Sequence, residues 1–249
     1  MNSAMTNVKT IGKRELSAYF ASPVAYVFIV IFLLLAGFFT FMAGFFFERN
    51  QANLESFFQW HPWLFLFLVP AVGMRLWSEE RRMGTMELLL TMPITAWQAI
   101  VGKFLASWFF LGLALAFTFP VVLTVNYLGN PDNGVIVGQY IGSFLMAGAY
   151  LAISCMTSAM TRNQVVSFIL AVVICLFLIL AGWPPVTDLL AQISESQLLI
   201  ETVAAFSIMT HFESFRRGVL DTRDIVFYLS VVVFCLFTTA VIIRSHRAG

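Results

Sequence analysis

Six long apolar runs, separated by more polar segments, constrain this chain more than any other feature of its sequence. Each run approaches or exceeds the length that a helix needs to cross the roughly 30 Å hydrocarbon core of a bilayer. Lipid offers no hydrogen-bonding partner to a peptide group, and a helix satisfies its backbone groups within the segment itself. We predict transmembrane helices over residues 23–47, 60–77, 99–128, 135–160, 165–183 and 225–243.

The composition supports a membrane protein. Of 249 residues, 60% are hydrophobic and only 11% are charged, whereas soluble domains carry about 25% charged residues. We therefore predict an all-α membrane protein in which residues 1–249 form a single transmembrane domain. The three cysteines lie inside apolar runs, so we expect neither a disulfide framework nor a metal site, and nothing indicates nucleic-acid binding.

Two regions outside the predicted spans are amphipathic. Residues 8–20 carry apolar side chains at helical spacing opposite Lys9, Lys13 and Arg14, which predicts an N-terminal interfacial helix. Between spans five and six, residues 185–223 mix helical apolar periodicity with charges, which predicts two external amphipathic helices. We expect an external cap to be lined by Leu189, Ile193, Val203 and Phe206.

One polar stretch, residues 75–93, is the strongest candidate for a functional segment. Burying Glu79, Glu80, Arg81 and Arg82 at mid-bilayer would cost about 3 kcal/mol per charge, or roughly 10 kcal/mol together, so the stretch must reach water. We predict a short amphipathic helix that starts at Thr85 as N-cap, has Glu87 in its first turn and ends at Pro93. Leu88, Leu89 and Leu90 give it an apolar side.

The distribution of basic residues predicts the orientation. Six spans place both termini on one side, and lysine and arginine favour the cytoplasm. Ten basic residues would lie on the side of the N-terminus: Lys9, Lys13, Arg14, Arg75, Arg81, Arg82, Lys103, Arg162, Arg244 and Arg247. Four would lie outside: Arg49, Arg216, Arg217 and Arg223. We expect a protein of the cytoplasmic (inner) membrane with both termini and the segment 78–95 in the cytoplasm.

A row of glycines in the fourth span, Gly134, Gly138 and Gly142, recurs every four residues. Small residues at this spacing let another helix approach closely. The approaching helix could belong to the same subunit or to a second one, and the sequence leaves both open.

Several signatures are missing. Gly102-Lys103 is followed by Phe104 and lacks the upstream glycine of a P-loop, so the chain has no nucleotide-binding motif of that kind. The spans carry few ionisable residues at mid-depth, which disfavours an ion-coupled carrier.

The order of residues in the polar stretch resembles the cytoplasmic segment of ABC-2-type permeases. It runs Glu80-Arg81, Gly84-Thr85, Glu87, Leu88-Leu89-Leu90, Pro93 and then Gly102-Lys103, and the plan of helices matches along nearly the whole chain. Residues 212–221 resemble the branch of the family associated with gliding motility. The resemblance implies the permease subunit of an ATP-driven exporter, paired with a second permease subunit in a homodimer or heterodimer.

In that family the segment is a coupling helix that docks on a separate ATPase. By this resemblance Glu79, Glu80 and Arg81 would make polar contacts, and Thr85, Glu87, Leu88 and Leu89 would form the seated helix. ATP and Mg²⁺ would be bound by the partner, and this chain would hold no cofactor. The alternative is a membrane anchor or scaffold that does not transport and that recruits a soluble partner through the same loop.

Overall fold

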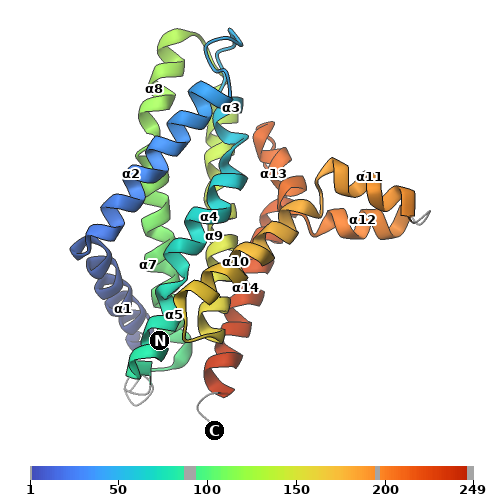
Figure 1. Ribbon diagram of the computed structural model, residues 1–249. Coiled ribbons are helices and arrows are strands. Elements are labelled where there is room, and N and C mark those ends of the chain that lie inside the picture. The colour runs from blue at the N-terminus through green and yellow to red at the C-terminus, as the bar shows by residue number, and fades with distance from the viewer. Residues whose placement is uncertain (1, 87–93, 194–196, 246–249) are drawn as a thin grey trace.

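The computed structural model describes residues 2–86, 94–193 and 197–245, and these are arranged as a bundle of helices with no strand (Figure 1). The elements, in chain order, are α1 (Asn2–Ala21), α2 (Pro23–Phe38), the π-helical η1 (Phe39–Ala43), α3 (Glu55–Phe58), α4 (His61–Gly73), α5 (Arg75–Met83), α7 (Ala96–Ala116), α8 (Phe119–Leu128), α9 (Asn133–Met160), α10 (Gln164–Leu180), α11 (Pro184–Ile193), α12 (Gln197–Ala205), α13 (Ile208–Arg216) and α14 (Thr222–Ser245).

Helix α9 is the centre of the bundle, with α4, α5, α7, α10, α13 and α14 packed around it. Small residues permit this crowding. A Cβ added to Gly73 of α4 would lie 2.3 Å from Cβ of Ser154, and one added to Gly148 would lie 2.7 Å from the Trp108 indole. The helices therefore pack at distances that larger side chains would forbid.

The all-α membrane fold is confirmed for the described residues. Four helical stretches are long and apolar enough to cross a membrane: Pro23–Ala43, Ala96–Leu128, Asn133–Met160 and Thr222–Ser245. Gln164–Leu180 is apolar but shorter, and α4 has 13 residues.

Two of the predicted span boundaries are wrong. Helix η1 ends the first span at Ala43, and Phe45 has a φ of 50°, so residues 44–47 lie outside the helix. The predicted second span, 60–77, is broken at Met74, where α4 gives way to α5. Trp77, the last residue of that predicted span, is fully buried, with an exposed fraction of 0%. The third predicted span is interrupted just before Pro120, because α7 stops at Ala116 and α8 restarts at Phe119.

The N-terminal helix is present and longer than its apolar periodicity predicted. Its apolar side lies on protein: Ile11 packs against Gly102 of α7, and the ring of Tyr19 stacks on Phe110 with centroids 5.1 Å apart. Helix α1 is thus part of the bundle, and its position at the membrane surface stays a prediction.

Residues 185–223 contain three helices rather than two. Helices α11 and α12 form a hairpin that projects sideways from the bundle (Figure 1). Helix α13 instead packs on α9 with Ile208, Phe212 and Phe215 buried, so the expectation of a surface helix is wrong there. Asp224 of α14 accepts a hydrogen bond from His211 at 2.6 Å, which secures α13 to the last span.

The four predicted cap residues have different surroundings. Leu189 and Phe206 are exposed, and Val203 is half-buried. Ile193 closes α11, but its side chain lies outside the described residues. Because α11 and α12 project sideways from the bundle, the external cap stays a prediction.

Candidate functional site: helix α5 and the Lys103 cluster

Helix α5 is held at its start by one hydroxyl group of α9. The first N–H groups of a helix have no partner within it. Here the Ser158 Oγ accepts from the backbone N–H of Trp77 and of Ser78, both at 3.0 Å, and donates to the carbonyl of Met74 at 2.8 Å. This single side chain therefore supplies a partner for two N–H groups of the first turn of α5 and for a carbonyl at the break between α4 and α5.

Two further contacts fasten α5 to α9. The indole N–H of Trp77 donates to Cys155 Sγ at 3.2 Å, and the Arg81 guanidinium donates to the carbonyl of Ala159. Partial burial, with Arg162 close by, lowers the pKa of Arg81. The segment that the sequence presents as a solvated loop is thus anchored along its length.

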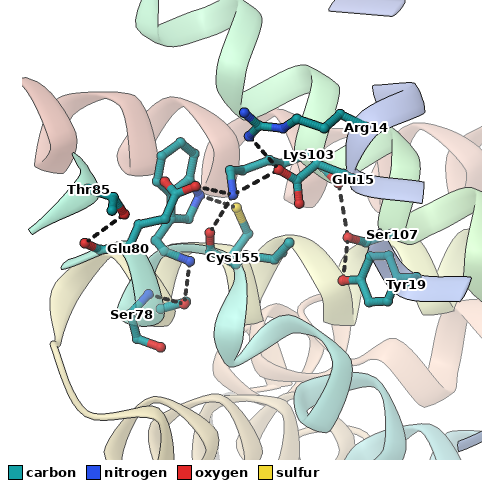
Figure 2. A network of polar contacts seen from close by, with 12 residues as sticks. Arg14, Glu15, Tyr19, Ser78, Glu80, Thr85, Lys103, Ser107 and Cys155 are labelled. Carbon is teal, nitrogen blue, oxygen red and sulfur yellow. Dashed lines mark hydrogen bonds and ion pairs between the residues drawn. The ribbon is translucent and has the colours of Figure 1, made fainter. Parts of the chain in front are cut away.

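Lys103 is the buried centre of an ion-paired cluster (Figure 2). Its exposed fraction is 3%, and its Nζ lies 2.8 Å from Glu80 Oε1, 3.4 Å from Glu15 Oε1 and 3.1 Å from the carbonyl of Leu76. The same ammonium lies 5.2 Å from the centroid of the Trp77 ring. A buried ammonium needs such partners because its desolvation costs several kcal/mol. The cluster joins α1, α5 and α7.

Beside the cluster, helix α1 carries a charged pair of its own and makes one further hydrogen bond to α7. Arg14 donates to Glu15 at 2.9 Å, and the hydroxyls of Tyr19 and Ser107 are 3.0 Å apart. Burial raises the pKa of Tyr19 to about 12, so its phenol stays neutral and hydrogen-bonded. Figure 2 shows these groups beside the Lys103 cluster.

Helix α5 ends at Gly84, whose φ of 70° is a left-handed conformation that glycine adopts at little cost. The Thr85 hydroxyl donates back to the carbonyl of Glu80 at 3.4 Å. Residues 87–93 lie outside the described residues, and with them Glu87, Leu88, Leu89 and the partners that Thr85 would cap.

The predicted contact residues thus divide into two groups. Glu80 and Arg81 are engaged within the chain, whereas Glu79 lines an open pocket beside α1. Sequence reasoning missed the part played by Lys103. A single lysine inside an apolar run is itself a signal, because it needs an anionic partner from another helix.

The glycine row of α9 contacts helices of the same chain. A Cβ on Gly142 would lie 2.5 Å from Cβ of Phe215, and one on Gly138 would meet Gly218 at 3.4 Å. Gly134 instead faces the Asp132 carboxylate that caps the helix. The close approach at Gly138 and Gly142 is therefore to α13 and the turn that follows it.

The fold and the cluster together define a helical membrane domain with a charged, tightly anchored segment at one end. In the part of the chain that the structure describes, no group of three or more His, Cys, Asp or Glu side chains could hold a metal ion. Residues 10–244 match the family described as ABC-2 family transporter protein, and the chain belongs to that family. It is a membrane component of an ABC-2 transporter. A comparison with curated proteins gives no match.

Proposed function

We propose that this chain is the permease subunit of an ATP-driven exporter and that segment 78–95 receives the motion of a separate ATPase. Two permease subunits would surround the pathway, with ATP and Mg²⁺ held by the partner chains. We also propose, from the likeness of residues 212–221, that the chain belongs to the branch of the family associated with gliding motility.

The observation that carries the proposal is the anchoring of α5. A coupling element must pass a push from its partner to the spans rather than absorb it. Ser158, Cys155 and Ala159 fix α5 to α9, while the Glu80–Lys103–Glu15 cluster fixes it to α7 and α1. A displacement of α5 would therefore move three helices together.

We further propose six crossings, made by α2 with η1, α4, α7 with α8, α9, α10 and α14. Figure 1 places both termini at the end of the bundle that holds α5. With the excess of lysine and arginine at that end, the coupling segment would face the cytoplasm of a cell whose inner membrane holds the protein.

Co-purification tests the coupling role directly. The chain would be isolated from native membranes in mild detergent, and partners identified by mass spectrometry. We expect an ATPase to co-purify with the wild type. We expect a variant combining Glu79→Lys and Glu87→Lys to lose it by about tenfold or more, because reversed charges at a docking surface repel the partner.

Glu48→Lys is the matched control, since Glu48 is an exposed carboxylate at the opposite end of the first span. It should retain the ATPase. Co-purification of a soluble partner without nucleotide hydrolysis would favour the anchor alternative. Equal recovery of the ATPase with the double variant and the control would contradict docking on this segment.

A further inference from the structure

Two adjoining pockets lie where α1, α2, α4, α5 and α7 meet. The first, the polar pocket, has a volume of about 230 Å³ and is lined by the charged side chains of Glu15, Arg75, Glu79, Glu80 and Lys103, among others. The second, of about 220 Å³, is almost entirely apolar, with Val27, Phe28 and Leu68 in its walls. Tyr19 and Arg75 line both pockets. The polar pocket thus adjoins the apolar pocket.

The apolar pocket opens toward the outer surface of the bundle. Val24, Val27 and Ile31 of α2 line it and are exposed on a helix that is long and apolar enough to span a membrane. Its neighbours on that side are therefore lipid tails, and the polar pocket lies toward the end of the bundle that holds α5.

Two side chains of opposite charge in the polar pocket, Arg75 and Glu79, have no partner among the described residues. Among the described residues, neither the Arg75 guanidinium nor the Glu79 carboxylate makes a hydrogen bond or an ion pair through its side chain. They stand one turn apart on α5, at a spacing that allows i,i+4 pairing, yet they do not pair. Both are half-buried and line the same space.

A third group also lacks a partner. Lys103 binds Oε1 of Glu80, while Oε2 of that carboxylate is buried with no hydrogen-bond donor. Leaving a buried acceptor unpaired is destabilising, so a ligand that donates a hydrogen bond to it would be favoured. Glu15 is already shared by Arg14 and Lys103.

We propose that the two pockets form a binding site for an aminophospholipid of the phosphatidylethanolamine type from the adjoining leaflet. The phosphate would pair with Arg75, the primary ammonium would lie between Glu79 and Glu80, and an acyl chain would fill the apolar pocket. Arginine pairs with phosphate through two parallel hydrogen bonds. A primary ammonium has three protons to donate, as two adjacent carboxylates require.

The charge pattern distinguishes this lipid from others. Phosphatidylglycerol carries the phosphate but no cation for Glu79, and phosphatidylcholine carries a quaternary ammonium that cannot donate a hydrogen bond. Glycerophosphoethanolamine has the headgroup but no tail for the apolar pocket. We therefore expect both of the other lipids and the tail-less headgroup to bind more weakly.

Native mass spectrometry of the purified chain, without an ATPase, tests the site. The protein would be delipidated in detergent and titrated with each of the three lipids and with glycerophosphoethanolamine. We expect phosphatidylethanolamine to bind about tenfold more tightly than the others, as one charge-assisted contact allows. Equal binding of the three lipids, or a preference for phosphatidylglycerol, would overturn the proposal.

Three variants locate the site. Arg75→Gln should weaken all three lipids by about tenfold, and Glu79→Gln should remove only the preference for the primary amine. Ala71→Phe should obstruct the apolar pocket and weaken all three lipids, since Ala71 lines it. Arg82→Gln, an exposed arginine on the same helix outside both pockets, should bind like the wild type.

Thermal unfolding of each variant in lipid-free detergent separates binding from folding. Each of the three site variants should unfold at the wild-type temperature and yet bind lipid as altered above. If such a variant binds lipid as the wild type does, the substituted residue does not contact the lipid in the way proposed. Because no ATPase is present, failure to prefer phosphatidylethanolamine would leave the coupling proposal standing. Failure of an ATPase to co-purify with the wild-type chain would contradict the coupling proposal and leave the lipid site standing.

Discussion

At the scale of single residues, Lys103 is the group on which the polar end of the bundle most depends. Removing one partner from a buried ion pair leaves the other charge uncompensated, which costs about 3–5 kcal/mol when the pair is fully buried. Glu15 and Glu80 each retain 17% side-chain exposure, so we expect Lys103→Met to lower the free energy of unfolding by about 3 kcal/mol. Chemical denaturation in mild detergent measures it.

A second substitution tests the cause. In the Lys103→Met background, Glu80→Gln removes a carboxylate that has lost its counter-ion, and it should recover part of the lost stability. Arg82→Met removes a positive charge from an exposed site and should change stability little. If Lys103→Met proved as stable as Arg82→Met, the cluster would have no structural role.

At the scale of elements, the packing of α13 on α9 depends on Gly142. A methyl group there would lie 2.5 Å from Cβ of Phe215, and neither backbone can easily give way. We expect Gly142→Ala to destabilise the protein by about 1–3 kcal/mol, as overpacking does. Unfolding measured in the same detergent would show it.

The control is another helical glycine. Gly37 of α2 has nothing within 4 Å of an added Cβ, so Gly37→Ala should leave stability unchanged or raise it by about 0.5–1 kcal/mol through helix propensity. A destabilisation of equal size at both positions would show that contact with Phe215 is not the reason.

The helices themselves were largely predictable from the sequence, but the segments against which they pack were not. Apolar runs of membrane-spanning length predict helices because lipid leaves the backbone few alternatives. The spacing of Ile208, Phe212 and Phe215 equally fits a helix on a membrane surface and one packed on a neighbour, and the structure shows the second. Likewise Trp77 has an interfacial residue type but a fully buried position, since Cys155 and Ser158 lie far from it in sequence.

The candidate site was predictable only in part, for the same reason. The charges of residues 79–82 point to a segment in water, and the glycine before Thr85 points to a helix end. The pairing of Glu80 with Lys103 depends on how α5 and α7 pack, which no local pattern encodes. The absence of a partner for Arg75 and Glu79 among the described residues likewise depends on how the helices pack.

At the scale of the whole molecule, the orientation that we propose in the membrane rests on charge and connectivity together. The chain enters and leaves at one end of the bundle, the same end as α5 (Figure 1). Arg162 in the link between α9 and α10 should share the cytoplasmic side, while Asn130 in the link between α8 and α9 should lie outside. Both side chains are exposed.

Labelling of single cysteines in intact cells tests this orientation. The native Cys155, Cys175 and Cys235 are buried, so they should contribute little background. An impermeant maleimide should react with an Asn130→Cys variant in intact cells but with an Arg162→Cys variant only after permeabilisation. The reverse pattern would put α5 outside the cell, where no ATPase could reach it, and would overturn the orientation and the coupling proposal together.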